Sequence, residues 1–71
     1  MEVNMKGLED LLKTVFHGNQ TAFAEATGIN RTHVNKVFKS NGRGAGATFC
    51  GAIMKYCINN NLDYNKYIFF S

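Results

Sequence analysis

The sequence predicts an all-α fold, a single compact domain of four to five helices spanning residues 1–71. The chain is long enough for one modest core and too short for a second domain. It contains no proline, which favours helices over a turn-rich β architecture. Apolar residues recur every three to four positions in several segments, and glycine or asparagine separates these segments. That spacing is typical of amphipathic helices.

Residues 5–16 are predicted to form the first helix. Its apolar residues share one helical face, and they are Leu8, Leu11, Leu12, Val15 and Phe16. Glu9 and Asp10 lie near its start, where negative charge suits the helix dipole. His17 and Gly18 end it, because glycine readily takes the left-handed conformation of a helix stop.

A second helix is predicted over residues 20–27, QTAFAEAT. Asn19 precedes it and is a favourable N-cap, because its side chain can accept a hydrogen bond from the first turn. The positions expected to face the core are Ala22, Phe23 and Ala26. Gly28 closes the helix, and Ile29 is expected to follow as a single buried residue.

A third helix is predicted over residues 31–39, RTHVNKVFK, with Asn30 as its N-cap. Its apolar stripe is narrow and consists of Val34, Val37 and Phe38. Its other faces carry Arg31, Thr32, His33, Asn35, Lys36 and Lys39. The helix contains no acidic residue, so its polar side is entirely neutral or basic.

Residues 40–47, SNGRGAGA, hold three glycines and are predicted to be a loop. This is not a phosphate-binding glycine loop, because no strand precedes it and the P-loop lysine is missing. Thr48 can cap a fourth helix over residues 49–60, which ends in an asparagine run. Its inner side is expected to carry Phe49, Ile53, Met54, Cys57 and Ile58. The tail, residues 62–71, is apolar and aromatic, and its pattern fits a short helix or a strand.

Cys50 and Cys57 are predicted to be two small apolar residues on one core-facing stripe. Their spacing on a helix is too long for a disulfide. The chain has no Cys-x-x-Cys motif, and its only histidines are His17 and His33, so no metal site and no cofactor is expected. The sequence also lacks paired carboxylates and a nucleophile beside a base, and we do not expect an enzyme.

The net charge of +3 is unevenly distributed along the chain. Residues 1–25 hold two basic and four acidic residues, whereas residues 26–62 hold five basic residues and no acid. A block of one sign in a folded region favours a polyanionic partner. No apolar run approaches the roughly 20 residues of a membrane span, and the N-terminus is too acidic for a signal peptide. We therefore expect a cytoplasmic protein with no membrane contact and no small-molecule ligand.

Residues 20–39 satisfy the position rules of a helix-turn-helix. Counting from Gln20, the fifth residue must be small because the two helices cross there, and it is Ala24. The ninth residue must tolerate a left-handed backbone, and it is Gly28. Three further positions must be apolar anchors, and they hold Ile29, Val34 and Val37. All five requirements are met in register, although such units also occur as plain structural corners.

This stretch, QTAFAEATGINRTHVNKVFK, resembles the helix-turn-helix of phage repressor and Cro proteins, the Cro/CI-like or XRE-like family. The first and fourth predicted helices extend the resemblance over residues 5–62, although the long loop at 40–47 departs from the family pattern. The resemblance implies a repressor-like domain that regulates transcription, from a phage, plasmid or other mobile element. Its partner would be a double-stranded DNA operator. The rival hypothesis is a protein-interaction module, similar to an antirepressor, that uses the same fold.

The resemblance also implies roles for individual residues. In this family the second motif helix enters the major groove and its N-terminal half contacts base edges. The residues that match those positions are Asn30, Arg31, Thr32, Asn35 and Lys36. Phosphate contacts are expected from Asn19, Gln20, His33, Lys39 and Arg43. For Thr32 and His33 the alternative is a solvated polar side chain without a contact.

Regulators of this kind pair on two half-sites, so a homodimer is expected. Large apolar residues concentrate in the tail, and the self-complementary contact is predicted to involve Tyr67, Ile68, Phe69 and Phe70. Strand-to-strand pairing is one form that this contact could take. In the alternative, Leu62, Tyr64 and Ile68 close the protomer's own core while the phenylalanines fray.

Overall fold

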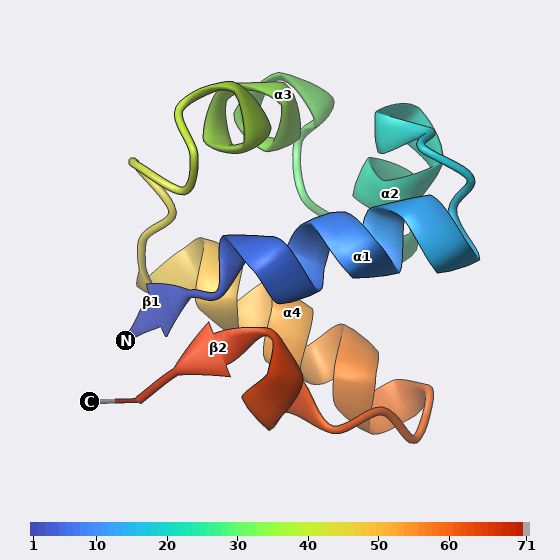
Figure 1. Cartoon of the computed structure of the whole chain (residues 1–71), viewed down its shortest axis with the longest axis vertical. Helices are drawn as coiled ribbons and strands as arrows, with labels where there is room; N and C mark the ends of the chain where they lie inside the picture. The colour runs from blue at the N-terminus through green and yellow to red at the C-terminus, as the bar shows by residue number, and fades with distance from the viewer. Residues whose placement is uncertain (71) are drawn as a thin grey trace.

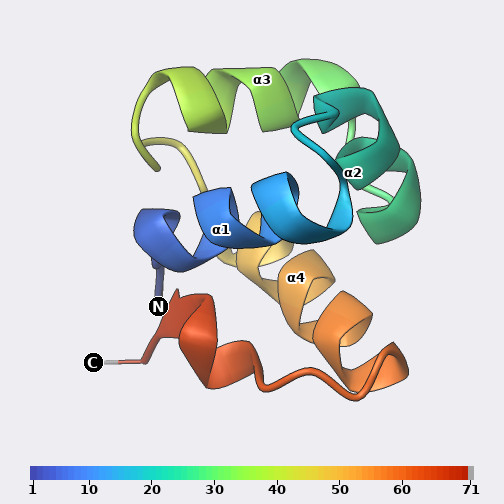
Figure 2. The same cartoon turned by 45° about the vertical axis from the view of Figure 1, so that its right-hand side comes forward.

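Four α-helices, one 3₁₀ helix and a two-stranded antiparallel sheet make up the computed structural model, which describes residues 1–70. In chain order they are β1 (Glu2–Val3), α1 (Met5–Val15), α2 (Gln20–Thr27), α3 (Arg31–Lys39), α4 (Ala47–Asn59), η1 (Tyr64–Lys66) and β2 (Ile68–Phe69). Helix α1 crosses the middle of the molecule, with α3 on one side and α4 and the tail on the other (Figure 1; Figure 2). The predicted all-α class is confirmed, with a small sheet added.

Asparagine side chains start three of the four helices. The side-chain oxygen of Asn4 accepts from the Gly7 amide (3.3 Å), and that of Asn19 accepts from the Ala22 amide (3.1 Å). Asn30 caps α3 in the same way, as described below. Helix α4 is the exception, because Gly46 is its N-cap and provides no side-chain hydrogen bond. The prediction of Thr48 as the cap is therefore wrong, since Thr48 already lies in the first helical turn.

The turn between α2 and α3 has the predicted backbone. Gly28 is the C-cap of α2 with a φ of 74°, in the left-handed region, and its amide donates to the Ala24 carbonyl. The next amide, that of Ile29, donates to the same carbonyl at 3.1 Å. Gly28 thus supplies the conformation that lets the chain reverse direction between the two helices.

Gly28→Ala is expected to lower the free energy of unfolding by about 1–2 kcal/mol, the cost of a left-handed L-residue. A Cβ there would meet nothing within 4 Å, so backbone strain alone causes the loss. Gly51→Ala is the matched control, because Gly51 lies inside α4 with open space around it. That change should stabilise the protein by about 1 kcal/mol through helix propensity. Urea unfolding measures the free energy of unfolding of both variants. If Gly28→Ala stabilised the protein as Gly51→Ala does, residue 28 would not have the left-handed conformation of the turn.

The core joins all four helices and the last strand. Its buried residues are Met5, Leu8, Leu11, Phe23, Ala24, Val34, Val37, Phe49, Cys50, Ile53, Cys57 and Ile68. Phe23 is at its centre, with its ring 5.4 Å from that of Phe16 and 5.7 Å from that of Phe38. Cys50 and Cys57 are free and buried, and burial raises the pKa of both thiols. Their predicted place in the core is confirmed.

Three predicted core positions are wrong. Val15 is 48% exposed, because it lies in the last turn of α1, where Phe16 instead packs against Phe23 and Tyr56. Ile58 is 61% exposed, because Cys57 takes the inward position on α4 and the next residue is rotated about 100° away from it. Ala26 is also exposed, and Ala24 is the buried alanine of α2.

The two ends of the chain are joined to each other. In the sheet Glu2 lies opposite Phe69 and Val3 lies opposite Ile68. The backbone amide of Asn4 also donates to the Tyr67 carbonyl at 2.7 Å. Both termini therefore emerge at the same end of the molecule (Figure 1). Nothing in the local sequence predicts β1, and the pattern of the tail fits a short helix or a strand equally well.

This arrangement corrects part of the predicted dimer contact. Ile68 is only 2% exposed and belongs to the protomer's own core, so its assignment to a dimer interface is wrong. Tyr67 is half-buried, and burial raises the pKa of its phenol. Phe69 and Phe70 remain about half exposed, at 49% and 48%. Along a strand alternate side chains face opposite sides, which is why burial of Ile68 leaves Phe69 outside.

None of the helices in the described residues, 1–70, is long and apolar enough to cross a membrane.

Candidate nucleic-acid interface

Helix α3 has one buried side and one open side. Val34 and Val37 are fully buried beneath it, and Phe38 is half-buried. The residues exposed along the helix are Arg31, Thr32, Asn35, Lys36 and Lys39. Two valines thus fix the helix on the core and leave an outer face without acidic residues.

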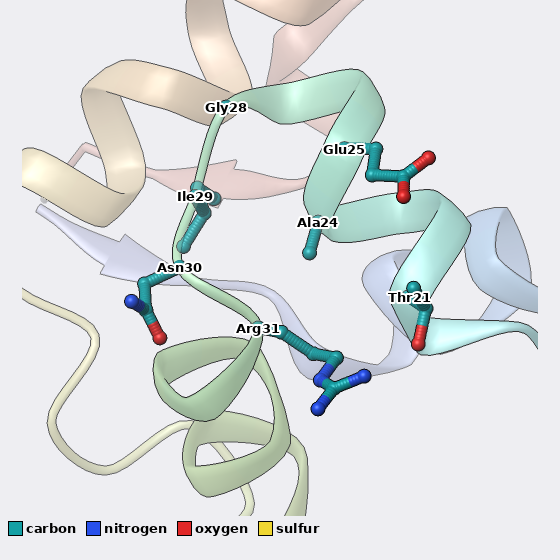
Figure 3. A pocket seen from close by; sticks show the side chains of 7 residues that line it. All are labelled: Thr21, Ala24, Glu25, Gly28, Ile29, Asn30 and Arg31. Atoms are coloured by element: carbon teal, nitrogen blue, oxygen red, sulfur yellow. The ribbon is translucent and has the colours of Figure 1, made fainter.

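A shallow hollow of about 590 Å³ lies at the elbow between α2 and the start of α3. Its lining residues are Thr21, Ala24, Glu25, Gly28, Ile29, Asn30 and Arg31. Ala24 and Ile29 lie on either side of it, from α2 and from the turn (Figure 3). Arg31 extends from the start of α3 toward the side where Thr21 lies, whereas Asn30 turns the other way (Figure 3). Arg31 therefore projects from the leading end of α3, beside a hollow that Glu25 also lines.

The asparagines of the motif differ in how much of their amide is free. The side-chain oxygen of Asn30 accepts from the Thr32 amide at 2.8 Å, so one of its two acceptor positions is occupied and the orientation of the amide is set by the cap. Asn19 has the same restriction through its cap bond to Ala22. Asn35 is exposed and has no such cap bond. Bidentate pairing with adenine needs an amide that can turn both its oxygen and its nitrogen toward the base, and the uncapped amide of Asn35 fits this best.

The start of α2 offers backbone donors. The first N–H groups of a helix have no partner inside it, and Asn19 satisfies only that of Ala22. The amides of Gln20 and Thr21 are the others in this turn. Together with the helix dipole they favour an anion at this end. Gln20 is half-buried and Asn19 is exposed, both beside these amides.

The His33 side chain is held by contacts inside the protein. It is half-buried, and its Nε2 lies 3.1 Å from the Gly44 carbonyl in the loop after α3. Its ring also packs edge-on against Phe49 of α4, with centroids 5.4 Å apart. A phosphate contact was predicted for His33, but only its Nδ1 is left for one. Sequence reasoning missed the internal contacts because they join residues 11 and 16 positions apart.

The loop between α3 and α4 carries the remaining predicted phosphate residue. Asn41, Gly42 and Gly44 have φ values of 58°, 96° and 83°, so three of its residues are left-handed. Arg43 lies between the two glycines and is exposed, as is Lys39 in the last turn of α3. The two side chains place basic groups on the segment that directly follows the motif.

Within residues 1–70, no three His, Cys, Asp or Glu side chains gather into a possible metal site. Comparison of the chain with protein-family models, with curated proteins and with solved structures finds no match.

Proposed function

We propose that this protein is a sequence-specific double-stranded DNA-binding regulator of transcription, a repressor that acts in the cytoplasm and comes from a mobile genetic element. One observation carries the proposal. A helix-turn-helix with a left-handed Gly28 holds α3 by two buried valines and leaves its other face exposed and free of acids. A helix held in this way fits the B-DNA major groove, and a basic face suits its phosphates.

The chemistry of each side chain suggests its part in binding. Arg31 can donate two hydrogen bonds to the O6 and N7 of guanine, and Asn35 can pair with the N6 and N7 of adenine. Thr32 and Lys36 line the same face, and Asn30 can donate from its free NH₂. The first turn of α2, Lys39 and Arg43 would contact phosphates, which adds affinity and salt dependence without reading sequence.

Selection of bound duplexes from random DNA, followed by sequencing, is the first test. The proposal expects enrichment of a defined motif, with two related half-sites about one helical turn apart. Recovery of unenriched DNA would show non-specific binding only. Absence of any duplex binding at low salt would overturn the proposal and favour the protein-interaction module.

Arg31→Ala or Asn35→Ala should weaken binding to the selected duplex by roughly 1–3 kcal/mol and leave binding to a scrambled duplex nearly unchanged. The reason is that base contacts are lost while phosphate contacts remain. Titration of both duplexes at equal salt measures the difference. Lys55→Ala removes one positive charge, as Arg31→Ala does, from an exposed position on α4 and serves as the control for that variant. Equal losses on both duplexes would show that neither side chain reads a base.

For the homodimer, we infer a contact centred on Phe69 and Phe70. Antiparallel pairing of Glu2 with Phe69 brings the two chain ends together, and Met1, Phe69 and Phe70 are each about half exposed. Phe70 also packs on Tyr64, with ring centroids 5.7 Å apart. The two-stranded sheet thus presents an apolar end that a second copy could cover by two-fold symmetry.

Phe69→Ser is expected to make the protein monomeric while the fold is retained, because Phe69 faces away from the core. Sedimentation velocity over a range of protein concentrations measures the change, and circular dichroism checks the fold. Ile58→Ser is the control, since Ile58 is more exposed but lies on α4. A dimer that survives Phe69→Ser and is lost with Ile58→Ser would place the interface on α4.

A further inference from the structure

The loop after α3, residues 40–46, is held in one shape although it is rich in glycine. The Ser40 hydroxyl donates to the Arg43 carbonyl at 2.7 Å, and the Gly42 amide donates to the Val37 carbonyl at 2.9 Å. The Ala45 amide donates to the Gly42 carbonyl at 3.3 Å. The left-handed φ values of Gly42 and Gly44 show that glycine is needed here for conformation.

His33 connects this loop to both neighbouring helices. It belongs to α3, its Nε2 contacts the Gly44 carbonyl, and its ring lies against Phe49, which is 1% exposed in the first part of α4. A carbonyl oxygen can only accept, so Nε2 must carry the proton in this contact. Gly44 directly follows Arg43, and the Ser40 bond holds the carbonyl of Arg43 itself. On the other side of the Arg43 side chain, the Arg43 amide donates to the Ser40 carbonyl at 3.4 Å, so the backbone is hydrogen-bonded both before and after this side chain.

We propose that His33 is a positioning residue, which holds the loop 40–46 as a preformed second DNA-contacting element with Arg43 as its phosphate-binding side chain. This inference rests on the proposed DNA binding. Arg43 is exposed in a segment, residues 26–62, that contains no acid, and the Glu2 carboxylate of β1 lines the same surface hollow as Arg43. A loop that is already ordered loses less conformational entropy on binding than a free glycine-rich loop would. His33 then acts on DNA affinity through the backbone of Gly44 and not through a contact of its own.

Two substitutions of His33 separate an effect through the Gly44 backbone from a direct contact of His33 with DNA. The amide of glutamine extends one methylene further than that of asparagine, so His33→Gln can still donate to the Gly44 carbonyl, whereas His33→Asn falls short. Both lose the ring contact with Phe49 equally. Gly44→Ala disturbs the same loop without changing His33. The φ of Gly44, 83°, strains any L-residue, whereas an added Cβ would meet nothing within 4 Å.

The experiment is a double-mutant cycle between His33→Asn and Arg43→Ala on random duplex DNA over a range of salt concentrations. Arg43→Ala should reduce the slope of log K against log salt by about 0.9, the value for one phosphate contact. His33→Asn and Gly44→Ala should each reduce the slope toward that of Arg43→Ala. His33→Gln should keep a slope close to that of the wild-type protein. The double variant should lose no more than Arg43→Ala alone, because both changes remove one contact. Amide exchange at Ala45 should accelerate in His33→Asn and not in His33→Gln.

Additive losses in the double variant would overturn the proposal, because His33 would then contact DNA by itself. It is equally overturned if His33→Gln behaves as His33→Asn does, or if Arg43→Ala leaves the slope unchanged while the wild-type protein binds. Failure of the wild-type protein to bind any duplex would instead refute the proposed function. In that case the exchange rate at Ala45 still decides whether His33 holds the loop.

Discussion

Gly7→Ala is expected to lower the free energy of unfolding by about 3 kcal/mol, as for severe overpacking of a core. A Cβ on Gly7 would overlap the carbonyl oxygen of Lys66 and touch the Tyr67 ring. The obstacle is backbone and cannot swing aside, so α1 and η1 would have to separate. Alanine normally stabilises a helix by about 1 kcal/mol over glycine, which makes the sign of the effect diagnostic.

The overlap would also break hydrogen bonds that connect the two ends of the chain. Asn4 accepts from the Gly7 amide and donates from its side chain to the Lys66 carbonyl at 3.1 Å. Chemical denaturation of Gly7→Ala, with Gly51→Ala as the control, measures the effect. A Gly7→Ala protein as stable as the wild type would mean that the tail does not pack on α1 in solution.

Ile68→Ala is expected to cost about 2–5 kcal/mol, the range for truncating a buried aliphatic side chain. Ile68 is 2% exposed and closes the core from β2. A domain of this size rarely has more than about 3–5 kcal/mol to lose, so the variant should be largely unfolded at physiological temperature. Phe69→Ala, at the next position and 49% exposed, is the matched control and should be much milder. Thermal unfolding of both compares them, and similar melting temperatures would contradict the buried place of Ile68.

The expected instability of Ile68→Ala affects how the oligomeric state can be tested. A chain that ends at Tyr64 would lose β2 and Ile68 together, so it should unfold whether or not the tail forms a dimer contact. Deletion of the tail therefore cannot separate folding from association. The surface change Phe69→Ser can, because it removes an exposed side chain and keeps the strand.

The helix-turn-helix can be predicted from local sequence alone. Asn19, Asn30 and Gly28 were identified from local rules, and the structure shows both caps and the left-handed glycine. The bounds of α2 and α3 agree with the predicted ranges. Caps and turns depend on hydrogen bonds between residues two to five positions apart, so the information lies within a single short stretch of sequence.

Burial of the residues at the chain ends and the contacts of His33 depend instead on how the elements pack together. Pairing of β1 with β2 joins opposite ends of the chain, and strands of two residues are too short to show an alternating pattern. The tail was apolar enough to suit either a core or an interface, and the pairing alone turned Ile68 inward and Phe69 outward. The contact of His33 with Gly44 likewise depends on how the loop folds back after α3. Local sequence specifies local hydrogen bonds, but burial and long-range contacts arise only when the elements pack together.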